Sequence, residues 1–226
     1  MAKHVCITGC TRGLGRALVD WFLENDWRVS GFGRNSEAIA ELDEKGSAGT
    51  HFGSVDVRDT DAIKTFFDLL FSDIGIPDLL VNNAGAINAN APLWEVPAEE
   101  FEKVIDVNIS GVYRVLKYVA PAMIKRGSGI MINLSSGWGR STSSDVAPYC
   151  ATKWGVEGLS QAMAQELPHG VAVAAMNPGI IDTDMLRSCF GEGAASFSDA
   201  TTWAQTAGPY LASLDISVNG RQLTAP

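Results

Sequence analysis

Short apolar runs alternate with longer helical patterns along almost the whole chain, and this alternation restricts the fold more than any other feature. The apolar runs have the length of buried strands. The segments between them repeat apolar residues at helical spacing, as Leu18, Val19, Phe22 and Leu23 do. Strands that alternate with helices form a parallel sheet with helices on both faces. The sequence therefore predicts an α/β protein with a doubly wound parallel sheet, in a single three-layer domain over residues 1–226.

The pattern also places the individual elements. The expected strands are residues 4–8, 27–32, 51–55, 78–82, 129–135, 171–177 and, at the end, 215–218. The expected helices are residues 15–25, 36–44, a third from Asp59 or Thr60 to Phe71, 98–124, 148–167 and 201–214. The segment 184–199 is rich in Gly, Ala and Ser and follows the sixth strand, at the sheet edge where ligands bind. We expect a short, mobile substrate lid there, with a plain surface loop as the alternative.

The balance of charge limits the partners of the protein. It has 17 basic and 26 acidic residues, for a formal net charge of −9. Binding to nucleic acid or to anionic lipid depends on Lys and Arg that neutralise phosphates. We therefore expect no nucleic-acid partner and no membrane partner, although one well-placed arginine still suffices to bind the phosphate of a nucleotide.

The four cysteines (Cys6, Cys10, Cys150 and Cys189) form no disulfide framework for a chain of this length, so we expect reduced thiols. No second Cys/His pair accompanies Cys6 and Cys10, and we predict no metal site. No charged and hydrophobic leader precedes the first strand, and no apolar run approaches the ~18 residues of a membrane span. We expect a cytoplasmic protein.

A glycine-rich turn, Thr-Gly-Cys-Thr-Arg-Gly-Leu-Gly at residues 8–15, directly follows the first expected strand and opens the first helix. Glycines allow a tight turn and a close backbone approach, and the helix N-terminus offers free N–H groups to a pyrophosphate. The G-x-x-x-G-x-G spacing differs from the general G-x-G-x-x-G fingerprint, but its strand–turn–helix context predicts a dinucleotide site.

The end of the second strand indicates which dinucleotide binds. NAD sites place a carboxylate there for the ribose 2′-hydroxyl, and NADP sites replace it with positive charge. Here Gly33 is followed by Arg34 with no acid, and Arg12 of the glycine loop is able to reach the same pocket. We therefore predict NADP(H) in preference to NAD(H), the alternative being that both arginines are solvated. Asp56 and Val57, after the third strand, are expected at the adenine edge, although Asp56 is also an ordinary turn former.

Tyr149 and Lys153 are four residues apart, on one face of an expected helix. A free tyrosine has a pKa of about 10. We expect the neighbouring ammonium to favour the phenolate and lower that pKa, as acid–base catalysis requires. Ser136 follows the fifth strand at the carboxyl edge of the sheet, where its hydroxyl is placed to stabilise charge on a substrate oxygen.

Together these residues resemble the classical short-chain dehydrogenase/reductase family, over nearly the whole chain. The glycine loop resembles the family's TGxxxGxG motif, and residues 82–85 (Asn-Asn-Ala-Gly) its NNAG motif. Asn108, Ser136, Tyr149 and Lys153 match its catalytic tetrad, and Pro178-Gly179 with Thr183 its PG motif. The resemblance implies a Rossmann fold.

The resemblance also implies residue roles. Tyr149 would exchange the proton, Lys153 would bind the nicotinamide ribose, Ser136 would polarise the carbonyl, and Asn108 would anchor a water linking Lys153 to solvent. The residues expected to bind the cofactor are Gly9, Thr11, Arg12, Gly13, Leu14, Gly15, Arg34, Asp56, Val57, Asn83, Ala84, Gly85, Tyr149, Lys153, Pro178, Gly179, Ile181 and Thr183. The tail after Thr183 is short for the family, so we expect a reduced lid and an open pocket.

The expected function is hydride transfer between NADP(H) and a small-molecule carbonyl or alcohol. Two alternatives are a nucleotide-binding regulatory protein of the same fold with little catalysis, and an NAD-linked alcohol dehydrogenase. Substrate identity is open. An acyl-carrier-linked substrate would need a basic patch, for which Arg140 and Arg187 are available, and Trp138 either walls the substrate site or packs internally.

Residues 99–124 and 149–167 form expected helices with apolar faces. These faces pack either within one subunit or against a second one. The resemblance favours the second arrangement, as a homodimer or homotetramer.

Overall fold

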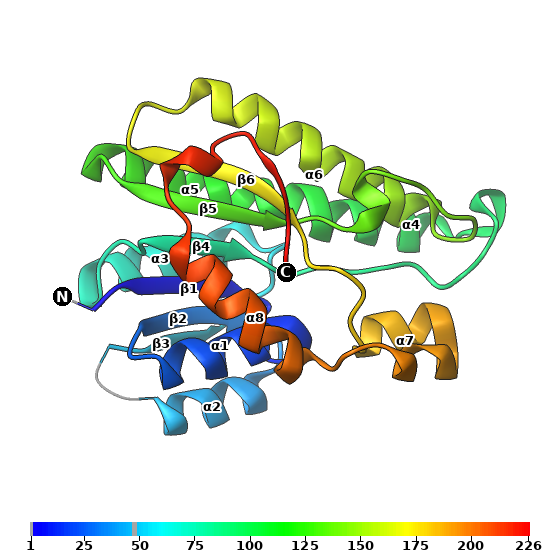
Figure 1. The fold of residues 1–226 in the computed structure, drawn as a ribbon, viewed down its shortest axis with the longest axis horizontal. Coiled ribbons are helices and arrows are strands. Elements are labelled where there is room, and N and C mark those ends of the chain that lie inside the picture. Colours follow the sequence, from blue (N-terminus) through cyan, green and yellow to red (C-terminus); the bar gives the residue numbers. More distant parts are fainter. Residues whose placement is uncertain (1, 47–48) are drawn as a thin grey trace.

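A computed structural model describes residues 2–46 and 49–226 of the chain. The described part has a seven-stranded parallel sheet in the order β3-β2-β1-β4-β5-β6-β7 (Figure 1). The strands are β1 (His4–Thr8), β2 (Arg28–Gly33), β3 (His51–Ser54), β4 (Leu79–Asn82), β5 (Gly129–Leu134), β6 (Val171–Asn177) and β7 (Gln222–Thr224).

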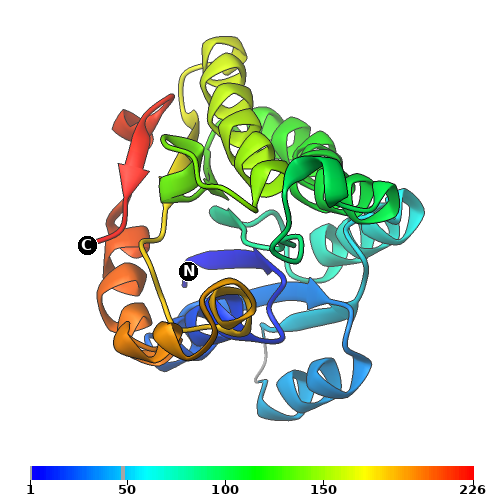
Figure 2. The same ribbon diagram turned by 90° about the vertical axis from the view of Figure 1, so that its right-hand side faces the viewer.

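Helices cover both faces of this sheet, which confirms the predicted doubly wound architecture (Figure 2). One face carries α1 (Gly13–Glu24), α2 (Ser36–Lys45) and α8 (Ala200–Ser213). The other carries α3 (Thr60–Asp73), α5 (Gly111–Arg126) and α6 (Ala147–Glu166). Asp59 caps α3 as expected, because its side chain accepts hydrogen bonds from the backbone N–H groups of Asp61 and Ala62. Within residues 2–46 and 49–226, every helix is too short or too polar to cross a bilayer.

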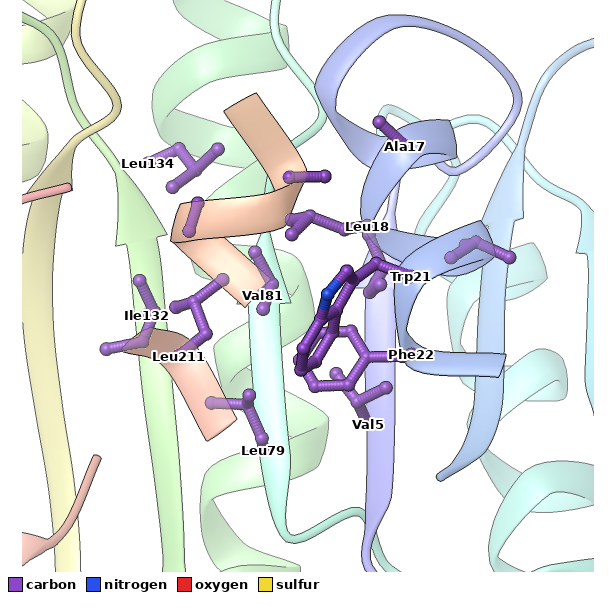
Figure 3. Close-up of a cluster of buried hydrophobic side chains, with 14 of the residues drawn as sticks. Val5, Ala17, Leu18, Trp21, Phe22, Leu79, Val81, Ile132, Leu134 and Leu211 are labelled. Atoms are coloured by element: carbon purple, nitrogen blue, oxygen red, sulfur yellow. The ribbon is translucent and has the colours of Figure 1, made fainter. Parts of the chain in front are cut away.

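Two apolar cores lie on the two faces of the sheet. Val5, Val81 and Ile132 point toward α1 and α8, where they meet Trp21 and Leu211 (Figure 3). Their neighbours Cys6, Leu80 and Met131 point to the opposite core. Successive strand side chains alternate between faces, so a strand covered on both sides needs apolar residues at consecutive positions. This is why the strands read as continuous apolar runs in the sequence.

The direction of strand order reverses at β1, which pairs with β2 on one side and β4 on the other. A parallel sheet binds ligands beyond the carboxyl ends of its strands at such a switch point. The loops after β1 and β4 are joined there. The backbone N–H groups of Asn83 and Ala84 donate to the Thr8 hydroxyl at 3.1 and 3.0 Å. The fold therefore brings the glycine loop and residues 82–85 to one edge.

The prediction of a last strand at residues 215–218 is wrong. Asp215 accepts a hydrogen bond from Ser217 N at 2.8 Å, and this local turn directs the chain into a short 3-10 helix, Ile216–Val218. The last strand is β7, which pairs in parallel with β6. The segment does contain the apolar residues Ile216 and Val218. The turn that the Asp215 side chain forms with Ser217 N replaces the expected strand.

The expected helix at residues 98–124 is divided. α4 (Ala98–Ile105) passes through a π-helical segment, Asp106–Ser110, before α5 begins. The lid segment is also more regular than expected. It contains α7 (Asp184–Phe190), which Thr183 caps by accepting from Leu186 N at 3.2 Å, followed by a 3-10 helix, Gly191–Ser196.

Candidate active site

The turn between β1 and α1 leaves the N-terminus of α1 uncapped. Gly9 has a φ of +68°, and a Cβ there would lie 2.9 Å from Ala84 Cα, so the turn requires glycine. Arg12 is the N-cap of α1, and its side chain makes no capping hydrogen bond, whereas Asn35 caps α2 and Asp199 caps α8. The first N–H groups of α1 are therefore available to an anionic ligand.

A cavity of about 380 Å³ opens in front of this helix end. Most of the predicted cofactor residues line it: Gly9, Thr11, Arg12, Gly13, Arg34, Asp56, Val57, Asn83, Ala84, Gly85 and Thr183. Others of the predicted set lie outside its lining: Leu14, Gly15, Tyr149, Lys153, Pro178, Gly179 and Ile181. Ile181 is buried in the core beside α8, and the Pro178 carbonyl accepts a hydrogen bond from Trp203 Nε1 at 2.9 Å.

Several further residues line the cavity that we did not predict: Phe32, Gly33, Asn35, Val55, Ala86, Lys103, Val107, Asp184 and Met185. Asp184 and Met185 belong to the segment expected to be a lid, so their position was partly foreseeable. Lys103 comes from α4, and nothing in the sequence distinguishes it from other surface lysines.

Charged side chains of both signs line the cavity. Arg12 and Arg34 both line the cavity, and Arg12 Nη1 lies 3.4 Å from the exposed carboxylate of Asp184. Asp56 is paired with Arg58 at 2.8 Å. Burial raises the pKa of Asp56, but the hydrogen bonds and charge of Arg58 outweigh this, and the pKa is lowered. The glycine turn, the uncapped helix and the two arginines fit a phosphorylated dinucleotide.

Tyr149, Lys153 and Ser136 come together beyond the carboxyl ends of β5 and β6, as predicted. Lys153 Nζ lies 5.3 Å from the centroid of the Tyr149 ring and donates to the Leu134 carbonyl at 2.8 Å. The Ser136 hydroxyl accepts from Trp138 N at 3.1 Å. It lies close enough to the Tyr149 hydroxyl to lower the pKa of that group. Tyr149 and Lys153 are both buried.

The expected lowering of the tyrosine pKa is not observed. Burial raises the pKa of Tyr149 to about 12, and the hydrogen bond from Ser136 only partly opposes this rise. Burial also lowers the pKa of Lys153 to about 8. The ammonium group is directed at the Leu134 carbonyl, and desolvation of the phenol is the larger effect. The prediction of the Tyr149 pKa considered the charge of Lys153 but not the desolvation of the tyrosine hydroxyl.

Asn108 lies in the π-helical segment and is buried. Its Nδ2 donates to the Ala86 carbonyl at 2.8 Å and to Thr152 Oγ1 at 2.9 Å, and its Oδ1 accepts from Ala86 N at 2.8 Å. Both side-chain N–H groups are therefore used to join the loop after β4 to α6. The water-anchoring role implied by the family stays a prediction.

The cavity and the tyrosine are adjacent. Met185 lines the cavity and also packs in an apolar cluster around Tyr149, together with Ile87, Trp138, Cys150 and Cys189. Met185 of α7 thus lies between the cavity and the cluster that holds Tyr149.

The two arginines considered for an acidic carrier partner are both paired. Arg140 donates to the buried Glu157 at 3.1 Å and to the Leu223 carbonyl at 2.7 Å. Arg187 pairs with Asp182 at 2.7 Å. In the parts of the chain that the structure describes, no cluster of three or more His, Cys, Asp or Glu side chains has the arrangement of a metal site.

A family model and several known proteins match this chain. The family model described as short chain dehydrogenase matches residues 3–192. An NADPH-dependent pterin aldehyde reductase of Arabidopsis thaliana is 42% identical over 225 residues, covering 99% of this chain and 93% of that protein. A 3-oxoacyl-[acyl-carrier-protein] reductase of Staphylococcus aureus is 35% identical over 190 residues, covering 82% and 77%.

Solved structures give the same result. The structure titled "ElxO with NADP Bound" has a TM-score of 0.87 at 28% identity, covering 99% of this chain and 97% of that one. Levodione reductase has a TM-score of 0.88 at 27% identity, covering 98% and 95%. Sequence, fold and site arrangement thus agree, and the chain belongs to the short chain dehydrogenase family.

Proposed function

We propose that this protein is an NADPH-dependent oxidoreductase that reduces the carbonyl group of a small molecule, with Tyr149 as the proton donor. One observation carries the proposal: Tyr149, Ser136 and Lys153 meet beside a cavity lined by Arg12 and Arg34. The relatives support it, because the Arabidopsis protein is named as an NADPH-dependent aldehyde reductase and the Staphylococcus protein as a reductase of 3-oxoacyl groups.

NADPH, when bound, supplies the hydride, and the protein provides position and proton transfer. Ser136 donates a hydrogen bond to the substrate oxygen as negative charge develops there. With a pKa of about 12, Tyr149 holds its proton at neutral pH, which is the state needed to protonate that oxygen. Lys153, with a pKa of about 8, is mostly protonated at pH 7, and its charge stabilises the phenolate left behind. These protonation states suit reduction.

The surroundings favour a small neutral carbonyl compound over a carrier-bound one. Arg140 and Arg187 are engaged in ion pairs, which removes the basic patch that an acidic carrier protein would need. The aldehyde named for the Arabidopsis relative is a heterocyclic compound. We include aldehydes of this type in the proposed substrate range.

We further propose a cytoplasmic homodimer or homotetramer that has no nucleic-acid or membrane partner. The net charge of −9 supports the absence of polyanion binding. Exposed aromatic side chains on three neighbouring helices support the assembly: Phe101 on α4, Tyr113 on α5 and Trp154 on α6.

Replacing Tyr149 with phenylalanine tests the chemistry. Because general acid catalysis contributes about 100-fold or more, we expect Tyr149→Phe to lower kcat/KM for NADPH-linked reduction by at least about that factor. Its Kd for NADPH should stay within about twofold of the wild-type value. Tyr113→Phe is the matched control, since Tyr113 is exposed on α5. Equal turnover of ketones and aldehydes by wild type and Tyr149→Phe would show that the phenol has no chemical role.

Replacing Arg34 with aspartate tests the choice of cofactor. A charge-assisted bond to the 2′-phosphate is worth about 1.5–3 kcal/mol, so Arg34→Asp should raise the Kd for NADPH at least about tenfold. The Kd for NADH should be equal or lower, because a carboxylate there binds the ribose 2′-hydroxyl. Arg221→Asp makes the same charge change at an exposed position between the last 3-10 turn and β7. An equal loss for both cofactors would mean that Arg34 does not contact the phosphate.

A further inference from the structure

Two aromatic rings from distant parts of the chain stack beside Tyr149. Trp138 lies in the 3-10 turn Gly137–Gly139 after β5, and Phe190 is the last residue of α7. Their ring centroids are 6.0 Å apart with an interplanar angle of 13°. Trp138 also meets the Tyr149 ring edge-on, at 6.0 Å and 84°. A continuous aromatic surface therefore runs from the proton donor to the end of α7.

Hydrogen bonds fix the backbone at Trp138 and next to Phe190. The backbone N–H of Trp138 donates to the Ser136 hydroxyl, which ties the indole to the polar group expected to bind the substrate oxygen. Next to Phe190, the Cys189 carbonyl accepts from Asn90 Nδ2 at 2.9 Å, which joins the end of α7 to the loop after β4. Phe190 nevertheless keeps 46% of its surface exposed. An aromatic side chain that stacks on Trp138, next to Tyr149, is thus left open to contact.

The chemistry around the stack is apolar. Ile87, Met185 and Cys189 pack against the Tyr149 cluster, and the nearby cations Arg140 and Arg187 are held by Glu157 and Asp182. A ligand here would contact aliphatic, sulfur-containing and aromatic side chains around the hydroxyl groups of Ser136 and Tyr149. An aromatic ring gains affinity from a stacked or edge-on aromatic partner beyond what the burial of area provides.

We infer that Trp138 and Phe190 determine substrate selectivity, by packing against a planar aromatic ring that carries the reacting carbonyl group. This inference rests on the proposed function and assigns its specificity to two residues outside the catalytic set. Aliphatic carbonyl compounds of similar size bury a similar area but lack the ring contact. The site therefore selects substrates by the aromaticity of the ring and not by its size.

The experiment compares benzaldehyde with cyclohexanecarbaldehyde in NADPH-linked reduction. The quantity is the ratio of their kcat/KM values in each variant, because the different intrinsic reactivities of the two aldehydes cancel between variants. Phe190→Leu and Trp138→Leu should lower the ratio about threefold to tenfold, the range that the ring contact allows. Phe190→Tyr, which keeps the ring, should retain the wild-type ratio. Phe71→Leu, on the C-terminal part of α3, is the matched control and should also retain it.

A second measurement separates this inference from the proposed function. Benzamide and cyclohexanecarboxamide are not reduced, so their affinities in the presence of NADP⁺ report ring contact without turnover. A ratio of affinities that falls in Phe190→Leu and stays constant in Phe71→Leu supports the inference. If the aldehydes are reduced but neither ratio changes in Phe190→Leu or Trp138→Leu, the inference fails and the reductase stands. If no carbonyl compound is reduced, the proposed function fails, and equal amide affinities would then overturn the inference as well.

Discussion

At the scale of single residues, burial is the strongest influence on the pKa values of Tyr149 and Lys153. It raises the pKa of Tyr149 to about 12 and lowers that of Lys153 to about 8, so both groups shift toward their uncharged forms. The Tyr149 hydroxyl is therefore protonated at physiological pH. The lysine remains the group whose charge responds to mild alkali, because its proton is lost as the pH rises through about 8. In the proposed reaction, the charge of Lys153 would therefore stabilise the phenolate that forms, because it does not lower the pKa of the resting tyrosine below its usual value.

His4 gives a prediction about stability. Burial, and then the charge of Arg28, lower its pKa from 6.5 to about 4. Between these values the unfolded chain binds a proton that the folded chain does not, so stability falls as the pH falls from 6.5 to about 4. Through His4, the free energy of unfolding should fall by about 2–3 kcal/mol between pH 7 and 4.5.

Urea unfolding of His4→Val measures this effect. Valine suits a buried strand and does not titrate. Between pH 7 and 4.5, the free energy of unfolding of the variant should therefore fall by about 2–3 kcal/mol less than that of wild type. His169→Gln removes an exposed histidine and should behave as wild type does. If wild type and His4→Val lose the same unfolding free energy on acidification, a group other than His4 causes the acid sensitivity.

At the scale of elements, the π-helical segment between α4 and α5 has a structural consequence for the site. It positions Asn108 so that its amide joins Ala86 in the loop after β4 to Thr152 on α6. Thr152 in turn donates to the Tyr149 carbonyl at 2.7 Å. One buried side chain thus connects the cavity wall to the helical turn that carries the tyrosine.

Asn108→Ala should therefore destabilise the protein. Two backbone groups of Ala86 lose their partner, at a cost of about 2–4 kcal/mol, which corresponds to a fall in Tm of about 5–10 °C for a chain of this size. Calorimetry checks this. Asn90→Ala removes one exposed hydrogen bond, to the Cys189 carbonyl, and should cost less than about 1 kcal/mol. Equal Tm values for the two variants would contradict the bridging role.

At the scale of the whole molecule, α4 and α5 carry exposed aromatic side chains. Phe101 and Tyr113 are 39% and 54% exposed. If α4 and α5 pair with a second copy, Phe101→Glu/Tyr113→Glu should shift the protein toward monomer in light scattering after gel filtration, because buried like charges repel. Leu69→Glu, at an exposed position on α3, is the control and should leave the mass unchanged. A monomeric wild type, or equal dissociation in the control, would contradict the assembly.

The sequence by itself determined the layer order and the chemistry available. Alternating apolar runs specify strands buried on both faces, and a parallel sheet brings every loop that follows a strand to one edge. Local patterns such as residues 8–15 and the Tyr149–Lys153 spacing lie within single turns or helices, where geometry follows from sequence distance. This is why the sequence alone places the glycine loop, Ser136, Tyr149 and Lys153 near the carboxyl edge of the sheet, where the structure has them.

Only the tertiary structure decided what depends on contacts between distant segments. Phe190 reaches Trp138 because α7 crosses the site, and Lys103 enters the cavity lining because α4 lies beside it. The pKa of Tyr149 depends on how much water the fold removes, and Asp215 makes a turn where the apolar pattern favoured a strand. Desolvation and long-range packing are properties of the assembled chain, so no local pattern encodes them.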